Sequence, residues 1–301
     1  MLNTKDNNRV KIEGILSEIN MKYSSYTKNG ASMDAIGGDI KIRTKQNING
    51  TETELEIPVS VFANKYKNDG KPNPAYESLE KVMNEFKSIA AHGIDNADRV
   101  RITNGQLKMN EFYNRNGTLT SYPRINTSFI NRISKDECKP EATFTATFVV
   151  GKAGYAVDAD GVEDTNTYKI KAILPQYGNT VDVMEFVAHN PNVIDAISSY
   201  WQEGDTVKAS GRLNFSSRTE VISQAVDFGE PIVQERTISV SELILTGGSA
   251  TPLEGEFAYN SDEIRAALAQ RTAKLEADKA KKTATFNKAP GATKQGYDLG
   301  F

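Results

Sequence analysis

Residue types that support catalysis, metal binding or secretion are scarce in this chain of 301 residues. It has one cysteine, Cys138, so an intrachain disulfide is impossible, and its first eight residues lack the apolar core of a signal peptide. No run of about 18 apolar residues is present, which excludes a membrane-spanning helix. We therefore expect a protein of the reducing cytoplasm.

Motifs of enzymes and metal sites are missing as well. The only histidines, His92 and His189, lie at the boundaries of expected helices, and with a single cysteine they cannot form a zinc site. The acidic stretch 158–164 lacks the spacing of a calcium loop and is better explained as a solvated hairpin. There is no phosphate-binding glycine loop and no nucleophile elbow. We expect no catalytic residue, metal or cofactor, and no enzyme.

Charge is distributed unevenly along the chain, although the net charge is only −3. Residues 1–135 contain 20 Lys and Arg against 15 Asp and Glu, whereas residues 136–259 contain 8 against 19. Residues 260–301 are again slightly basic, with 8 against 5. The asymmetry indicates two different tasks and places an anionic partner at the first part of the chain.

Apolar residues recur with a period of two over several stretches, as half-buried strands require, and one stretch has helical spacing instead. Asn73-Pro74 precedes the helical stretch, and His92-Gly93 ends it. The expected elements are strands within 10–19, 36–42 and 55–61, a helix within 74–90, and strands within 100–109 and 125–129.

Residues 136–250 repeat this order. A second Asn-Pro pair, Asn190-Pro191, precedes the second helix, and Asp98–Leu107 resembles Asp205–Leu213 with one residue inserted in the first copy. Residues 59–62 likewise resemble residues 183–186. A repeat of about 100 residues indicates a duplicated domain. We expect domains at 1–135 and 136–250, followed by residues 251–301 as a helix and a disordered tail.

Three strands, a helix and two strands form the order of the OB-fold, a five-stranded barrel. Gly14 would let the first strand bend around such a barrel. The stretch Gly204–Leu213 resembles the fourth-strand entry of OB-type single-strand binders. The small, polar tail with a terminal aromatic resembles those of bacterial and phage single-stranded-DNA-binding proteins. The chain thus resembles a phage-type single-stranded-DNA-binding protein with tandem OB-folds, which implies a mainly β fold of two barrels.

The resemblance implies a mechanism that needs cations for phosphates and aromatic rings for bases. In an OB-fold, strands two and three and the loops joining strands one-two and four-five form the groove. Cations alternate with aromatic residues at these places in the first domain, whereas Phe62 and Phe129 are assigned to packing. The expected nucleic-acid-binding residues there are Lys22, Tyr23, Tyr26, Lys28, Lys41, Arg43, Lys65, Tyr66, Lys67, Arg99, Arg101, Phe112, Tyr113, Arg115, Tyr122 and Arg124.

The second domain is too acidic for equal affinity. Lys208 and Arg212 are expected to extend the binding surface, and residues such as Lys152, Tyr155, Lys169 and Lys171 could continue it. Otherwise this domain serves as a dimerisation or partner surface. Trp201 is expected to plug the barrel bottom.

The expected function is sequence-independent binding and protection of single-stranded DNA in phage DNA replication or recombination, in the host cytoplasm. Replication or recombination proteins would bind the tail through Tyr297, Asp298, Leu299 and Phe301. Two alternatives stay open: a β-rich structural or adaptor protein such as a virion component, and an RNA-binding OB protein.

Overall fold

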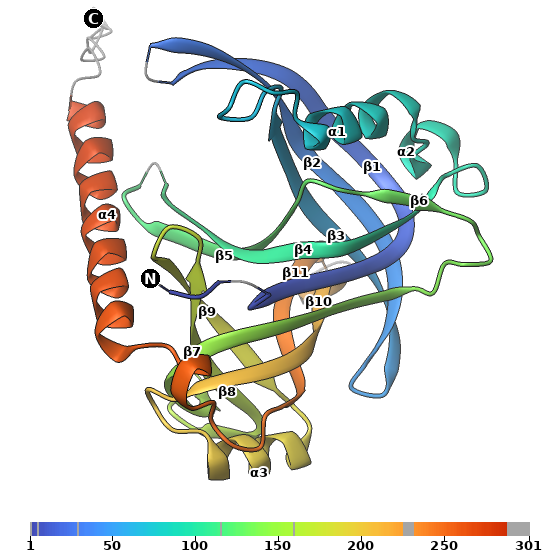
Figure 1. Ribbon diagram of the computed structural model, residues 1–301. Coiled ribbons are helices and arrows are strands. Elements are labelled where there is room, and N and C mark those ends of the chain that lie inside the picture. The colour runs from blue at the N-terminus through green and yellow to red at the C-terminus, as the bar shows by residue number, and fades with distance from the viewer. Residues whose placement is uncertain are drawn as a thin grey trace, which may run out of the picture.

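The structure is a computed structural model that describes residues 2–4, 6–28, 30–114, 116–158, 160–224 and 232–287. Within these ranges the side chains of 217–224, 232–238 and 283–287 are not described. The fold is mainly β, and 11 strands form one continuous sheet that closes into two barrels (Figure 1).

The first barrel pairs its strands in the order β1-β2-β3-β5-β4 and closes through β1 and β4. β3 and β5 run parallel, and the other neighbours are antiparallel. This is the strand order of an OB-fold. A short sixth strand pairs with the outer edge of β4. The strands are β1 (Asn8–Lys28), β2 (Ala31–Ile48), β3 (Thr51–Asn64), β4 (Arg99–Tyr113), β5 (Leu119–Thr127) and β6 (Asn131–Ile133).

The second barrel repeats the arrangement as β7-β8-β9-β11-β10 and closes through β7 and β10. Its third and fifth strands are again parallel neighbours. The strands are β7 (Glu141–Val157), β8 (Glu163–Gln176), β9 (Thr180–Ala188), β10 (Thr206–Gln224) and β11 (Ile232–Gly248). The mainly β class and the two five-stranded barrels are therefore as expected.

Strand periodicity fixes which side chains face the barrel interior. In β3, Leu55, Ile57, Val59 and Val61 are buried, while the residues between them face outward. The first strand of each barrel carries a glycine because it crosses closely over the second strand. A Cβ on Gly14 would lie 2.3 Å from the carbonyl oxygen of Arg43, so no larger residue fits there.

Helices close the barrels between strands three and four, and they begin identically. Asn73 caps α1 (Pro74–Glu85) and Asn190 caps α3 (Pro191–Tyr200), each accepting a hydrogen bond from a backbone N–H two residues later. The first helical segment is shorter than expected. α1 ends at Glu85, and a separate turn of helix, α2 (Ile89–His92), follows. Trp201, just after α3, is buried and donates to the carbonyl of Ser249.

Equivalent hydrogen bonds form at the start of the fourth strand in each of the two barrels. The Asp98 side chain accepts a hydrogen bond from the backbone N–H of Lys87 at 2.8 Å. The Asp205 side chain accepts one from the backbone N–H of Gln202 at 2.7 Å. Their backbone carbonyls each accept from the first strand of their barrel. The residue inserted in the first copy forms a bulge, because the β1–β4 register shifts between Val10 and Ile12.

β1 and β7 pair with each other and so join the barrels into one body. The pairing is antiparallel and runs from Asn8 opposite Ala146 to Glu13 opposite Glu141. Buried amides complete this junction. Asn8 exchanges two hydrogen bonds with the backbone of Leu107, and Gln46 bonds the backbones of Ala142 and Leu213. The buried apolar side chains of both barrels accordingly form one contiguous core.

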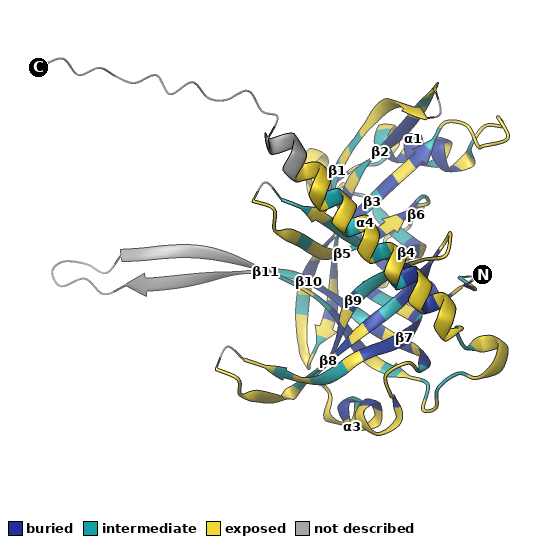
Figure 2. Cartoon of the chain, turned by 90° about the vertical axis from the view of Figure 1, so that its left-hand side faces the viewer, coloured by how far each residue is buried: buried dark blue, intermediate teal, exposed yellow. Residues whose placement is uncertain are grey.

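The last helix, α4 (Ser261–Asn287), follows a 3-10 turn, η1 (Gly255–Phe257), and packs across both barrels (Figure 2). Ile264 and Ala267 are buried against Val149 and Val181 of the second barrel. Further along, α4 contacts β4 of the first barrel. No helix in the described part of the chain is long and apolar enough to cross a membrane. The expected disordered tail lies outside the described residues.

Candidate nucleic-acid interface

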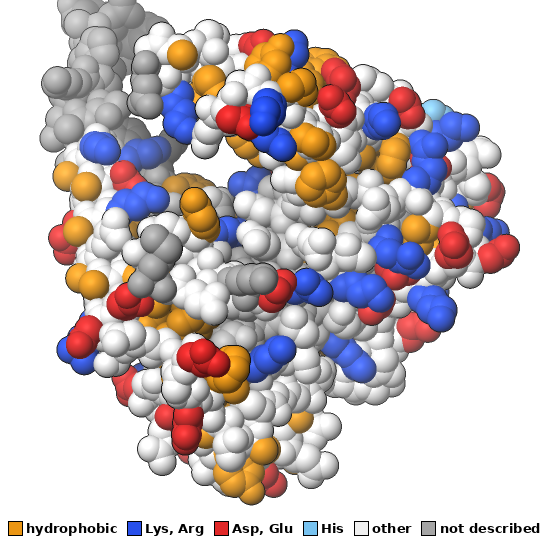
Figure 3. All heavy atoms as spheres, in the orientation of Figure 1, with side chains coloured by type: hydrophobic (Ala, Val, Ile, Leu, Met, Phe, Trp, Pro, Cys, Tyr) orange, Lys and Arg blue, Asp and Glu red, His pale blue; other side chains and the backbone are white. Residues whose placement is uncertain are grey.

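A groove of ≈ 780 Å³ lies on the outer face of the first barrel, over β2, β3, β4 and β5. Figure 3 shows the molecule hollowed on this side, between the part that carries β1, β2 and α1 and the part that carries β4 and β5. Apart from Val61, the lining side chains are polar or aromatic. They come from Ser60, Phe62, Asn104, Gln106, Arg124, Asn126, Thr127, Ser128 and Phe129.

Arg124 lines the groove and forms a hydrogen-bonded network with Asp39 and Ser60. Its Nη2 is 2.8 Å from Oδ1 of Asp39, and its Nε donates to Ser60, whose hydroxyl donates to Asp39. Partial burial would raise the pKa of Asp39, but the hydrogen bonds from Ser60 and Arg124 hold that pKa below its usual value. The network fixes the guanidinium over the groove and also neutralises its charge.

Exposed rings surround Arg124. Phe62 and Phe129 line the groove and are 53% and 51% exposed, so the assignment of both to packing is wrong. The ring of Tyr26 lies 6.3 Å from that of Phe62, and its hydroxyl donates to Asn64. Because Val61 and Ala63 are buried, the period of two already placed Phe62 on the outer face. That signal was available in the sequence.

The β1–β2 hairpin divides its predicted residues between two faces. Lys22 is in register with Gly37, which is in register with Phe62, so these three residues form one row on the groove side. Lys28 is exposed at the end of the hairpin. Tyr23 lies on the opposite face, where it donates to Glu80 and packs near Tyr76 of α1.

Lys65, Tyr66 and Lys67 follow β3 in an exposed loop. The ammonium of Lys65 lies 5.9 Å from the ring centroid of Tyr66. The backbone of Lys65 donates to Asp34 of β2, which fastens this loop to the end of the β1–β2 hairpin. The loop therefore continues the exposed surface of Tyr26 and Phe62.

Several predicted cations are already paired with carboxylates. Lys41 lies 2.7 Å from Glu18, and Arg43 lies 3.4 Å from Glu54, both on the outer face of the sheet. The hydrogen bond that Lys41 donates to Glu18 raises the pKa of Lys41 above its usual value. Figure 3 shows cations beside carboxylates over much of this side of the molecule. The surface next to the groove is thus a set of ion pairs and not a strip of unbalanced positive charge.

Arg99 and Arg101 do not line the groove. Arg101 lies 2.7 Å from Glu13, a carboxylate buried at the junction, and Arg99 donates to the carbonyl of Ala97. Glu13 also accepts from the backbone of Lys139, in the connection between the barrels. The structure gives both arginines partners within the protein.

The β4–β5 hairpin presents Phe112 and Tyr122 on the same face as Arg124. Their rings meet edge to face at 6.4 Å, and Asn110 donates to the Tyr122 hydroxyl. Tyr113 lies on the other face, with its ring centroid 6.0 Å from the ammonium of Lys279 in α4. Arg115, at the hairpin tip, lies outside the described residues.

Neither predicted cation of β10 lies in the groove of the first barrel. Lys208 borders a different pocket, together with Leu2, Phe257 and several acidic residues. Arg212 donates to the carbonyl of Asn47 at 2.6 Å and so links the second barrel to the β2–β3 hairpin. Tyr297, Asp298, Leu299 and Phe301 lie outside the described residues.

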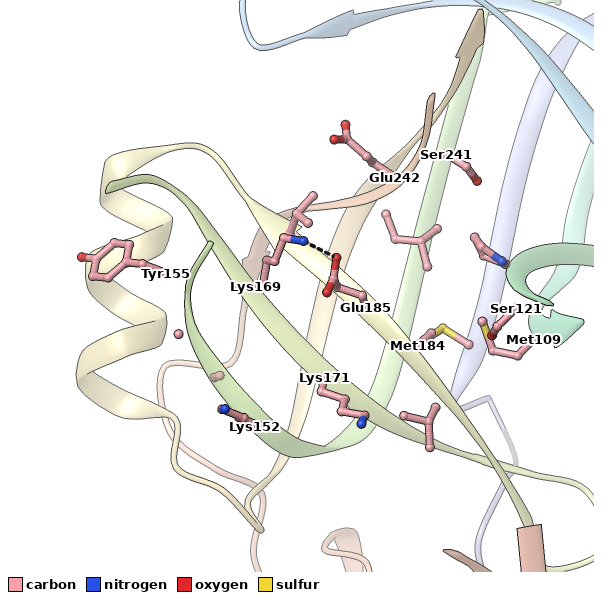
Figure 4. A pocket seen from close by; sticks show the side chains of 16 residues that line it. Met109, Ser121, Lys152, Tyr155, Lys169, Lys171, Met184, Glu185, Ser241 and Glu242 are labelled. Atoms are coloured by element: carbon pink, nitrogen blue, oxygen red, sulfur yellow. Dashed lines mark ion pairs between the residues drawn. The ribbon is translucent and has the colours of Figure 1, made fainter. Parts of the chain in front are cut away.

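A second groove of ≈ 580 Å³ lies on the second barrel (Figure 4). Lys152, Tyr155, Lys169 and Lys171 line it, and Lys169 is paired with Glu185 at 2.9 Å. The opposite wall is the β4–β5 hairpin, through Met109, Ser121 and Pro123. No group of three or more His, Cys, Asp or Glu suited to a metal occurs among the residues that the structure describes.

Comparison with known proteins places the chain in a family. No curated protein matches it. Two crystal structures of the single-stranded DNA binding protein from Thermus aquaticus are similar in part, one a deletion variant with 12% identity and a TM-score of 0.48, the other the wild type with 11% and 0.47. Both alignments cover 85% of this chain and 97% of theirs. The model of the YorF family matches residues 6–281, and the chain therefore belongs to the YorF family.

Proposed function

We propose that the chain binds single-stranded DNA without sequence preference, in the groove of the first barrel. The observation that carries the proposal is the exposure of Phe62, on β3, and Phe129, just after β5, in the same groove as Arg124. Large rings exposed beside a cation provide stacking surfaces for bases next to a contact for phosphate. A protein whose barrels were only a scaffold would have no need to leave these rings in solvent.

The polar lining of the groove supports binding that tolerates any sequence. Ser60, Gln106, Asn126 and Thr127 offer hydrogen bonds around the rings, whereas stacking itself accepts every base because each has a π face. The shape also suits a single strand. A groove between two hairpins, β1–β2 and β4–β5, admits an extended chain whose bases are free to unstack.

The residues that we propose as the interface are a subset of those expected from the sequence, with two additions. Tyr26, Phe62, Phe129 and Tyr122 would stack with bases. Lys22, Lys65 and Arg124 would contact phosphates, with Arg124 exchanging Asp39 for a phosphate oxygen. Arg99, Arg101, Lys208 and Arg212 have other contacts and are left out.

We further infer that the role is to cover and protect single-stranded template in DNA replication or recombination, as in phage proteins of this kind. Residues 1–135 would carry the main binding site and residues 136–250 a secondary one. Residues 251–301 would recruit replication or recombination proteins through the tail. An enzymatic activity is not part of the proposal, since the groove contains no residue set suited to catalysis.

The test is fluorescence anisotropy of a labelled dT oligomer of about 30 nucleotides, long enough for two OB sites, against a duplex and an rU oligomer at two salt concentrations. We expect tight binding to dT that weakens with salt, and little to the duplex. Preference for rU would indicate an RNA-binding protein. No binding by the folded protein to any of the three would contradict the proposal and favour a structural or adaptor role.

Variants of the two phenylalanines make the test specific to the groove. Phe62→Ala and Phe129→Ala should each cost about 1–3 kcal/mol of binding free energy for dT, because each removes a stacking surface. Phe257→Ala is the matched control, since Phe257 is 68% exposed but borders a pocket on the second barrel. Equal affinity of all three variants and the unmodified protein would exclude this groove as the site.

A further inference from the structure

The two grooves occupy overlapping positions on their barrels. The first lies over β2, β3, β4 and β5, and the second over β7, β8, β9 and β11, so each includes strands two, three and five of its barrel. The second domain is strongly acidic as a whole. Three of its five lysines line the groove, while most of its carboxylates lie elsewhere.

Two of these lysines are available to a ligand. Of the two carboxylates that line the groove, Glu185 pairs with Lys169, and Glu242 accepts a hydrogen bond from Asn214 at 2.8 Å. Lys152 and Lys171 are exposed, and neither forms an ion pair with any side chain that the structure describes. This contrasts with Lys41 and Arg43 beside the first groove, which carboxylates neutralise.

An aromatic ring accompanies these cations. Tyr155 lies at one end of the groove, and its ring meets that of Tyr168 edge to face at 5.2 Å. Tyr168 is held by the barrel core and supports this orientation. Figure 4 shows Lys152 and Lys171 on the same side of the groove as Tyr155, facing Met109 and Ser121 across it. The second groove thus combines cations with a supported aromatic ring.

The β4–β5 hairpin is the wall between the two grooves. One of its faces carries Arg124 toward the first groove, and the other carries Met109 and Ser121 toward the second. The hairpin is held in place from the second barrel and α4. The backbone of Met109 donates to Asp182 of β9, and Glu111 forms a bidentate ion pair with Arg271.

We propose that the second groove is a further subsite for the same nucleic-acid strand, with Lys152 and Lys171 as its phosphate contacts and Tyr155 as its stacking residue. The strand would pass from the first groove over the β4–β5 hairpin into the second. This inference rests on the proposed function, and it adds the path of the strand. It predicts that short oligomers occupy the first groove alone, because an OB site covers about 4–16 nucleotides.

The experiment measures affinity against salt concentration for dT oligomers of about 8 and about 30 nucleotides, with the full chain and the variant Lys152→Gln/Lys171→Gln. For the longer oligomer, the negative slope of log affinity against log salt should become shallower by roughly 1.4, since each lost phosphate contact removes about 0.7 from its magnitude. For the shorter oligomer the slope should stay unchanged. Lys135→Gln/Lys208→Gln is the matched control, because it removes two exposed lysines that line neither groove.

The outcomes separate the two proposals. An unchanged slope for the longer oligomer, with the unmodified protein binding normally, would overturn the second subsite and leave the proposed function intact. An equal fall for both lengths would also overturn it, because the short oligomer would then already use these lysines. Failure of the unmodified protein to bind either oligomer would overturn both proposals.

Discussion

Asp39 limits the charge that the first groove offers to a phosphate. Its carboxylate bonds both Arg124 and Ser60, so a phosphate oxygen has to replace it at the guanidinium. Such competition lowers affinity but keeps Arg124 in one orientation. In the proposed function, this competition would allow a bound strand to leave the groove.

Removing the carboxylate should therefore strengthen binding. We expect Asp39→Asn to raise the affinity for dT by about two- to five-fold, since a partly exposed ion pair contributes about 0–1 kcal/mol. The measurement is anisotropy at low salt. Asp195→Asn, which removes an exposed carboxylate from α3, controls for net charge. If both substitutions raised affinity equally, the effect would be one of overall charge and not of Arg124.

Single residues were the least predictable level, and the reason is geometric. The local resemblance of 59–62 to 183–186 aligns Phe62 with Phe186, yet Phe62 is exposed and Phe186 is fully buried. Strand side chains alternate between faces, so a register offset of one residue reverses every side chain. Arg101 illustrates a second cause. Its partner Glu13 is 88 residues away in sequence, and local sequence cannot reveal such a contact.

At the level of elements, the β4–β5 hairpin depends on α4 for its position. The side chains of Glu111 and Arg271 are both largely buried by their contact, and Lys279 lies near Tyr113 closer to the hairpin tip. Two-stranded hairpins are marginally stable alone in water. The hairpin that separates the grooves is thus ordered by a helix that follows it by about 140 residues.

We expect Arg271→Ala to loosen this hairpin without unfolding the barrels, because Glu111 loses its partner while the core is unchanged. Hydrogen exchange followed by mass spectrometry should show faster exchange in residues 109–123 and little change in β2 or β8. Arg265→Ala is the control, since Arg265 lies on the same helix in an exposed pair with Asp262. Identical exchange in all three proteins would show that α4 does not order the hairpin.

The order of elements was predictable from the sequence, because burial on one face imposes a period of two in strands and a longer one in helices. The Asn-Pro starts of both helices and the insertion in strand four were also visible. The break between α1 and α2 was not, since Met83, Phe86 and Ile89 continue a helical pattern across it. The lysines and Tyr155 of the second groove were named from the sequence as a continuation of the binding surface, but the acidic composition of the domain hid that three of its lysines line one groove.

At the level of the whole molecule, the junction between the barrels contains a buried carboxylate. Glu13 accepts hydrogen bonds from Arg101 and from the backbone of Lys139, close to Lys11 and Glu141. Burial alone would raise the pKa of Glu13, but Arg101, Lys139 and Lys11 together hold it below its usual value. Folding therefore favours the charged form of Glu13.

This linkage gives stability a defined dependence on pH. A carboxyl whose pKa is lowered by folding stabilises the protein above its ordinary pKa, near 4.5, and that stabilisation is lost as the pH falls further. We expect the free energy of unfolding to fall as the pH is lowered below about 5. In Glu13→Gln this fall should be less steep. Urea unfolding between pH 3.5 and 7 measures both. Equal pH dependence of unfolding in the unmodified protein and in Glu13→Gln would show that Glu13 does not contribute to that dependence.

The pairing of β1 with β7 has a consequence for synthesis on the ribosome. The first barrel closes through β4, so it can form before β7 has been translated, and the edge of Asn8–Glu13 then stays bare. A bare edge is a template for any strand of matching register, including β7 of a neighbouring nascent chain. A pause in translation before residue 141 would lengthen the time during which this edge can pair with another chain. The edge that joins the two barrels is therefore bare from the closure of the first barrel until β7 has been translated.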